Sequence, residues 1–134
     1  MILHTHPVRV YYEDTDLAGI VYYANYLKYI ERGRSEWIAS LGVDQTQMFA
    51  NQGVVFAVRR IEADYLRPAR FGEDLVVTTE VTGLTGARIL LDQAVLRNGE
   101  TLFRCAVVLI CLNVGGTAVR VPEIVRRVLS GAVH

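Results

Sequence analysis

Three carboxylates fall within four residues near the start of the chain, at Glu13, Asp14 and Asp16. A carboxylate can attack a carbonyl carbon or take a proton from water, so this cluster could support hydrolysis. Acidic residues also cap helix N-termini and complement the helix dipole, and spacing alone favours that structural role. Asp16, however, stands about eight residues ahead of the regular helical pattern, which is far for a simple cap.

The three histidines lie near the chain ends, at His4, His6 and His134. A Ser–His–Asp triad needs an imidazole in the body of the fold, and a zinc site would have to rest on the chain ends. We therefore expect a carboxylate that acts without histidine, with no metal and no redox cofactor.

The overall composition excludes several classes of protein. The 134 residues, 51% of them hydrophobic, fit one domain covering residues 1–134. Fourteen basic residues balance fourteen acidic ones without a run of like charge, so we expect no nucleic-acid partner.

The N-terminus and the cysteines indicate the compartment. Met1–Val10 holds no stretch apolar enough for a signal peptide, and the longest apolar run, Cys105–Leu112, is far too short to span a membrane. Cys105 and Cys111 fall in one expected strand, about 20 Å apart, which is too far for a disulfide within the chain. A soluble, cytoplasmic protein is expected.

The element that must position Asp16 is a helix from about Ala24 to Leu41. Its apolar residues share one face at helical spacing: Tyr26, Ile30, Gly33, Trp37 and Leu41. Gly42 follows where a C-cap glycine would end the helix. Because glycine inside a helix costs about 1 kcal/mol relative to alanine, Gly33 predicts the close approach of another backbone.

Outside this helix the hydrophobic period is two, which is typical of strands. Strands are expected at His6–Tyr12 (an edge strand), Val54–Leu66, Leu75–Val81, Arg88–Arg97 and Thr101–Asn113. Turns or loops are expected at Glu13–Gly19, Gly83 with Gly86, Asn98-Gly99 (a two-residue hairpin) and Gly115-Gly116, and a short helix at Pro122–Leu129. The class is α+β, with one long central helix and an antiparallel sheet of about five strands long enough to curl around it.

Several segments together resemble a known family. Val10-Tyr11-Tyr12-Glu13-Asp14-Thr15-Asp16, followed by Gly19-Ile20-Val21-Tyr22, is similar to the signature of the 4-hydroxybenzoyl-CoA thioesterase family of the hotdog-fold superfamily. It is similar in particular to the acyl-CoA thioesterases encoded beside the bacterial Tol–Pal envelope genes. The resemblance continues at Glu31–Trp37, Phe56–Arg60 and Tyr65–Arg70, and it implies a hotdog fold and hydrolysis of acyl-CoA.

The resemblance also implies roles for individual residues. Asp16 would be the nucleophile or general base, and the backbone N–H of Tyr23 would donate to the oxyanion. A helix N-terminus suits that second role, because its N–H groups are free and its dipole end is positive. Many Tol–Pal-type members carry histidine where this chain has Tyr23, but a backbone donor survives that change. The implied substrate-binding residues are Gly19, Ile20, Val21, Val55, Arg59 and Arg60.

The identity of the substrate stays open at this point. The phosphates of CoA require basic residues, and Arg59 and Arg60 are candidates, as are Arg67, Arg70 and Arg88; for each one, a solvated charge at a strand end is the alternative. The acyl group could be short- to medium-chain or aromatic, and acyl-carrier protein could present it in place of CoA. A non-catalytic acyl-CoA-binding module is the rival function.

The expected strand Thr101–Asn113 predicts self-association. It is apolar on both faces, and one helix can cover only one of them. Related hotdog thioesterases are dimers or dimers of dimers, so the resemblance implies a homodimer or homotetramer. In such an assembly Asp16 would face the Val54–Arg60 region of the partner.

Overall fold

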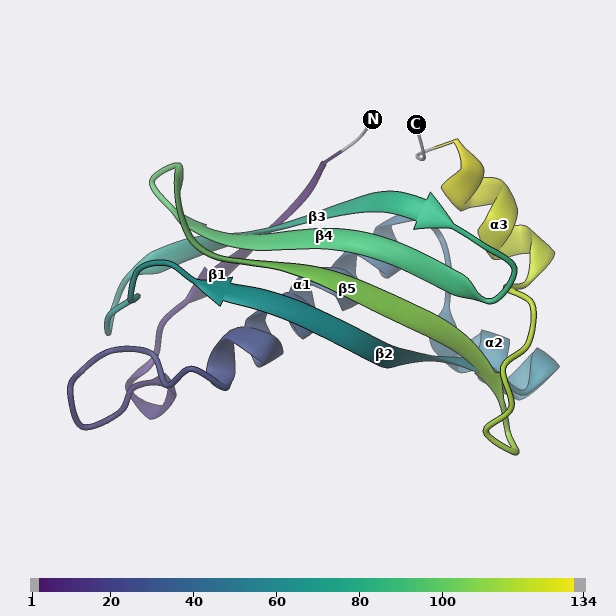
Figure 1. The fold of residues 1–134 in the computed structure, drawn as a ribbon, viewed down its shortest axis with the longest axis horizontal. Helices are drawn as coiled ribbons and strands as arrows, with labels where there is room; N and C mark the ends of the chain where they lie inside the picture. The colour runs from purple at the N-terminus through teal and green to yellow at the C-terminus, as the bar shows by residue number, and fades with distance from the viewer. Residues whose placement is uncertain (1–2, 132–134) are drawn as a thin grey trace.

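Five antiparallel strands form one sheet in the order β1-β3-β4-β5-β2, and the long helix α1 crosses one of its faces (Figure 1). The computed structural model describes residues 3–131. The elements are β1 (His4–Arg9), the 3-10 turn η1 (Tyr12–Asp14), α1 (Asn25–Ser40), α2 (Gln45–Gln52), β2 (Val54–Tyr65), β3 (Asp74–Leu84), β4 (Arg88–Arg97), β5 (Glu100–Asn113) and α3 (Glu123–Ser130). The predicted α+β class is confirmed.

The β4–β5 hairpin forms at the predicted dipeptide. Asn98 has φ 50° and Gly99 has φ 80°, which are the positive values that a two-residue primed turn requires. β5 therefore lies between β4 and β2, while β1 and β2 are the two edge strands. The predicted edge strand at the N-terminus is confirmed, although it ends at Arg9.

Helix α1 packs mainly against β1, β3 and β4 through the predicted apolar face. Tyr26, Ile30, Gly33 and Trp37 are all buried. A Cβ atom on Gly33 would lie 2.4 Å from Cγ1 of Val77 in β3. The predicted close approach is thus made by a side chain, and the expectation of a neighbouring backbone was wrong.

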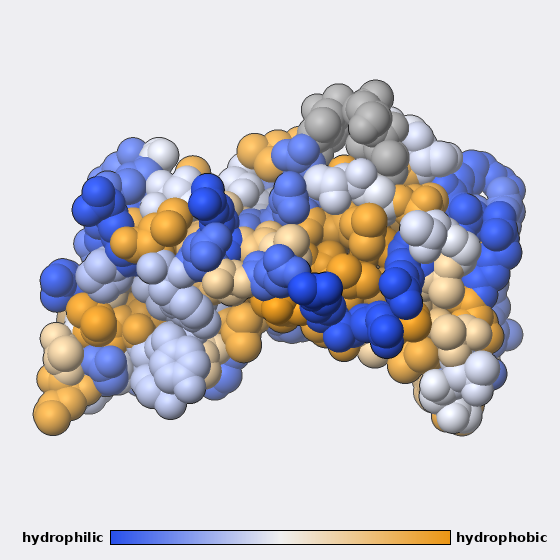
Figure 2. All heavy atoms as spheres, viewed as in Figure 1, coloured by the Kyte–Doolittle hydropathy of each residue, from blue (hydrophilic) through white to orange (hydrophobic). Residues whose placement is uncertain are grey.

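The side chains on the two faces of β5 are buried to different extents. The face towards α1 carries buried Phe103, Cys105, Val107 and Leu109, whereas Val108 and Ile110 on the opposite face remain half-buried. Figure 2 shows that opposite face, where apolar atoms gather over the middle of the sheet between hydrophilic groups. The strand is apolar on both faces, as predicted.

The sequence did not predict helix α2. Its signals are nonetheless present: Asp44 caps the N-terminus by accepting from the backbone N–H of Gln47 at 3.0 Å, and Gly53 ends it with φ 65°. Gly83 was wrongly expected to mark a turn. It pairs with Leu90 next to a bulge of β3, where an added Cβ would come within 2.8 Å of Leu90 Cδ1, and the chain turns at Gly86 instead.

Cys105 and Cys111 are both free and buried, in agreement with the sequence. Burial raises the pKa of the Cys105 thiol to about 11. Over residues 3–131, no helix has the length and apolar character needed to cross a membrane. His134 lies outside the described residues.

Candidate active site

Asp16 begins a tight turn. Its backbone N–H donates to the Ile20 carbonyl at 2.9 Å, and its own carbonyl accepts from the Gly19 N–H at 3.0 Å. Gly19 has φ 79°, a left-handed conformation that favours glycine, so its predicted place in the site has a backbone reason. One carboxylate oxygen of Asp16 accepts from the Ala18 N–H at 2.9 Å. The side chain is exposed, and its second oxygen meets no hydrogen-bond donor within the described part of the chain.

The turn is anchored on both sides. Thr15 pairs with Val21, and Ile20 pairs with Arg70, in short antiparallel bridges. Val21 also donates its backbone N–H to the Ala69 carbonyl at 2.8 Å. One segment, held by these bridges and hydrogen bonds, therefore carries four of the predicted site residues: Asp16, Gly19, Ile20 and Val21.

Asp14 ties this segment to the start of α1. Its carbonyl accepts from the Asn25 amide and from the Tyr22 N–H, each at 2.9 Å, while its buried carboxylate accepts from the Tyr11 N–H at 2.9 Å. The structural role that spacing favoured for the acidic cluster thus belongs to Asp14. Asn25 was not identified from the sequence. The signal that could have identified it is an asparagine at the start of the helix.

Free donors lie where α1 begins. Among the described residues, no group accepts a hydrogen bond from the backbone N–H of Tyr23 or of Ala24. Asp16 lies just inside the loop that the Thr15–Val21 bridge closes, and Tyr23 lies two residues beyond that bridge. Unpaired N–H groups at the positive end of a helix dipole suit a developing negative charge.

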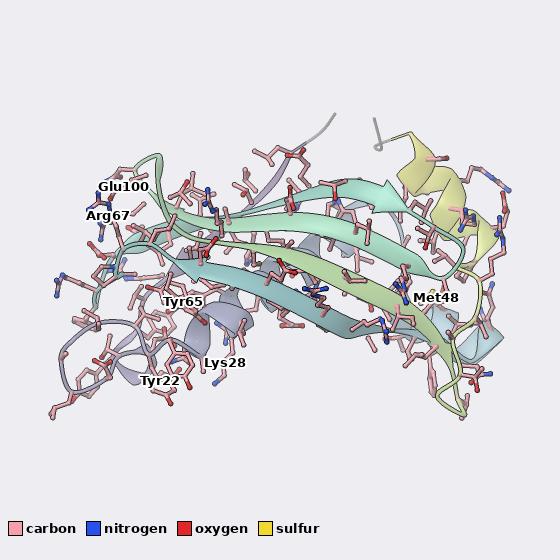
Figure 3. All side chains as sticks on the ribbon, viewed as in Figure 1. Tyr22, Lys28, Met48, Tyr65, Arg67 and Glu100 are labelled. Carbon is pink, nitrogen blue, oxygen red and sulfur yellow. The ribbon has the colours of Figure 1, made fainter. Side chains whose placement is uncertain are left out.

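Aromatic side chains join the helix start to the end of β2. Tyr65 packs against Tyr23, Tyr26 and Phe103, with ring centroids 6.1, 5.5 and 4.9 Å away. The Tyr26 hydroxyl accepts from the Ala69 N–H at 3.0 Å, and burial raises the pKa of Tyr26. In Figure 3, Tyr22 and Tyr65 lie on the same side of the molecule, next to Lys28 of α1.

The predicted residues on β2 do not join Asp16 within one chain. Val55 pairs with Leu112 near the start of the strand, ten residues before Tyr65, which is about 33 Å along an extended chain. Arg60 forms an exposed ion pair with Glu62, and Arg59 lies in a bulge. A single chain thus groups the five predicted residues of the segment from Asp16 to Tyr23 and leaves the three on β2 apart from them.

A buried polar group that the sequence did not predict lies between α1 and the sheet. Arg34, only 8% exposed, donates from Nη1 to Oε1 of Gln93 at 3.0 Å. The Gln93 amide donates to Thr79 Oγ1 at 2.8 Å and to the Ile30 carbonyl at 2.9 Å. Burial lowers the pKa of the Arg34 guanidinium. Helical and strand periodicity gave no sign that these residues meet.

Other charged residues near this end of the sheet pair with one another. Arg67 lies 3.1 Å from Glu100, and the two are labelled together in Figure 3. Arg97 pairs with Glu73 at 2.9 Å and with Glu100 at 3.1 Å. Within residues 3–131, no three histidine, cysteine or acidic side chains group as metal ligands would. The expectation that no metal or cofactor takes part stays a prediction.

Comparison with known proteins decides the family. Residues 10–129 match the family model described as "Thioesterase-like superfamily". The chain belongs to this superfamily. The predicted hotdog fold and the predicted membership of a thioester hydrolase family are both confirmed.

Individual relatives agree with this assignment. The acyl-CoA thioesterase YbgC of Haemophilus influenzae is 40% identical over 109 residues, which cover 81% of this chain and 80% of that protein. The crystal structure of a probable thioesterase from Bartonella henselae has a TM-score of 0.87 at 34% identity, covering 90% of this chain and all of that one. A 4-hydroxybenzoyl-CoA thioesterase mutant, crystallised with 4-hydroxybenzoyl-CoA, has a TM-score of 0.89 at 18% identity over 94% of this chain and 97% of that one, and shows the shared fold alone.

Proposed function

We propose that this protein hydrolyses acyl-CoA thioesters and that Asp16 is its catalytic carboxylate. One observation carries the proposal. An exposed aspartate with one unengaged oxygen is held on a hydrogen-bonded turn, and Asp14, just ahead of that turn, accepts from residues at the helix start, where the N–H groups of Tyr23 and Ala24 are free among the described residues. Thioester hydrolysis needs such a base or nucleophile together with a donor for the oxyanion.

The proposed reaction has two versions that these residues serve equally. In one, Asp16 takes a proton from water, and the hydroxide adds to the thioester carbonyl; in the other, Asp16 attacks the carbonyl itself and forms an anhydride that water then opens. In both, the Tyr23 N–H donates to the carbonyl oxygen as it becomes negative. Collapse of the intermediate breaks the C–S bond, and the CoA thiolate leaves and takes up a proton. One oxyanion donor is worth about 3–4 kcal/mol in the transition state.

The proposed substrates are short- to medium-chain or aromatic acyl-CoAs. YbgC of Haemophilus influenzae, an acyl-CoA thioesterase by name, supports CoA as the carrier. Gly19, Ile20 and Val21 would lie beside the thioester, and Arg59 and Arg60 would approach the phosphates. No cofactor is needed, and the reaction would take place in the cytoplasm. Acyl-carrier protein is the alternative carrier, and its acyl thioester belongs in the same assay.

We also propose that two copies complete the site. β2 is an edge strand, and Val58 and Tyr65, on its face towards α1, are both exposed. Pairing of two such edges would cover these side chains. It would also bring Val55, Arg59 and Arg60 of the partner towards Asp16, which they do not reach within one chain.

Thiol release from a panel of acyl-CoAs tests the function. Asp16→Asn keeps the size and much of the hydrogen bonding of the side chain but removes the base, so turnover should fall about 10²–10⁴-fold while acyl-CoA still binds. Asp92→Asn, a change at an exposed aspartate on the opposite face of the sheet, is the matched control and should leave turnover unchanged. Binding without hydrolysis by the unaltered protein would instead identify a non-catalytic acyl-CoA-binding module. Turnover near the wild-type rate in Asp16→Asn would rule out the catalytic assignment.

A further inference from the structure

Tyr65 makes the one side-chain hydrogen bond that the structure records to the backbone of Tyr23. Its hydroxyl donates to the Tyr23 carbonyl at 3.1 Å, across 42 residues of sequence. Tyr65 is the last residue of β2, and its ring is held by Tyr26 and Phe103. The donor therefore comes from a fixed position on the sheet.

The accepting carbonyl has no other partner among residues 3–131. The Asn25 N–H donates to Tyr22, and the Leu27 N–H donates to Ala24, so the helix ladder passes over Tyr23. The peptide between Tyr23 and Ala24 is trans, which makes its N–H point opposite to its carbonyl. By holding the Tyr23 carbonyl, Tyr65 also sets the direction of the free Ala24 N–H, and it restrains the residue that carries the free Tyr23 N–H.

We infer that Tyr65 is a positioning residue for the oxyanion donors at the start of α1. This inference rests on the proposed function, because the N–H groups that Tyr65 would orient are those that would donate to the thioester oxygen. Preorganised donors stabilise a transition state because they need no reorientation as charge develops. Tyr65 supplies that preorganisation from β2, the strand proposed to meet the second copy.

Two observations separate this role from simple packing. Within one chain Tyr65 is 47% exposed and Tyr23 is 61% exposed, so neither residue needs this hydrogen bond in order to avoid a buried, unpaired polar group. Desolvation also raises the pKa of the phenol, so Tyr65 remains a neutral donor at neutral and mildly alkaline pH. Within one chain the bond therefore satisfies no buried group, and its effect is to fix the direction of the Tyr23–Ala24 peptide.

Tyr65→Phe tests the inference, because it keeps the ring and removes only the donor. The turnover number should fall about 3- to 10-fold, the effect of losing one neutral hydrogen bond in the transition state. KM and the melting temperature should stay at their wild-type values, and the loss should be the same at pH 6 and pH 8.5. Tyr12→Phe is the matched control: Tyr12 is exposed, and its hydroxyl makes no hydrogen bond to the described residues, so its removal should change nothing.

The outcomes distinguish this inference from the proposed function. Wild-type turnover in Tyr65→Phe, beside an inactive Asp16→Asn, would overturn the role of Tyr65 and leave the function standing. A loss of turnover matched by an equal loss of thermal stability, or a change in KM alone, would also overturn it, since both point to structure or binding. An active Asp16→Asn, or no hydrolysis by the wild type, would end both proposals.

Discussion

Asp14 and Asp16 are two residues apart and carry the same carboxylate, but they meet different surroundings. Asp14 is buried, and its oxygens hold Tyr11, Tyr22 and Asn25. Asp16 is exposed on a turn and has an oxygen to spare. Each carboxylate accepts one backbone N–H, but only that of Asp16 is open to a substrate, so the proposed chemistry falls to Asp16.

Tyr23→Phe should keep most of the activity towards the best substrate. The proposed donor is the backbone N–H of Tyr23, which this change leaves in place, and the ring that packs on Tyr65 is also kept. The value of kcat/KM for thiol release measures the effect. A collapse to the level of Asp16→Asn would show instead that the phenol is essential.

Neither cysteine should react quickly in the folded protein. Only a thiolate is nucleophilic, and with a pKa of about 11 the Cys105 thiol is ionised to about one part in a thousand at pH 8. Thiolate forms only as the pH rises towards that value. Titration with a thiol reagent at pH 8 should find almost no fast reaction in native protein and two thiols in denaturant. A rapid stoichiometric reaction of the folded protein would contradict the burial of Cys105 and Cys111.

Between elements, close packing fixes how α1 lies on the sheet. Gly33 faces Val77 of β3 with no room for a further methyl group. Arg34, one residue on, reaches Gln93 of β4. One contact is steric and the other is polar, and each can be tested by a change in stability.

Gly33→Ala should destabilise the protein by about 1–2 kcal/mol. The new Cβ would lie 2.4 Å from Val77 Cγ1, and the cost of overpacking should exceed the gain of about 1 kcal/mol in helix propensity. Val77→Ala removes the clashing methyl groups, so the double variant should lose less stability than the sum of the two single changes. Denaturant unfolding measures all three. Strict additivity would mean that the two side chains do not meet.

Gln93→Leu should cost about 2–4 kcal/mol, because it leaves the buried Arg34 guanidinium without its hydrogen-bond acceptor. Adding Arg34→Met to that variant removes the stranded charge and should recover part of the stability. Urea unfolding of the two variants is the measurement. A double variant less stable than Gln93→Leu would show that Arg34 gains its stabilisation elsewhere.

For the whole molecule, the deciding feature is what one copy leaves uncovered. Val58 and Tyr65 are exposed on the α1 side of β2, and β2 has a free edge. The predicted residues Val55, Arg59 and Arg60 lie on this same strand, away from Asp16. Both facts are expected of a site that is shared between two copies.

Mixing two inactive variants should restore part of the activity. One chain carries Asp16→Asn, and the other carries a bulky change near Val55, such as Val58→Trp, at an exposed position on the α1 side of β2. If the site is shared, one site of each mixed dimer holds both defects and the other holds neither. The two variants are unfolded and refolded together so that mixed dimers form. Each variant unfolded and refolded alone is the control and should stay inactive. A stable, fully active monomer in sedimentation would refute the shared site.

Local pattern in the sequence predicted most of the elements and the segment that carries Asp16, the proposed catalytic carboxylate. The apolar stripe of α1, the alternation in β4 and β5, and Asn98-Gly99 each act over a few residues, so they can be read without knowing the fold. The Asp16 segment was recognisable for the same reason: its residues are contiguous. The short helix α2 was missed because its two capping residues enclose no strong apolar period.

Only the tertiary structure decided which distant residues meet. Asp14 is buried and Asp16 is exposed, although the two share one motif. Tyr65 reaches the Tyr23 carbonyl across 42 residues, and Arg34 reaches Gln93 across 59. Such contacts depend on the register and curvature of the sheet and on the placement of α1 across it. Periodicity gives the face on which a side chain lies, and the packing of whole elements determines what it meets there.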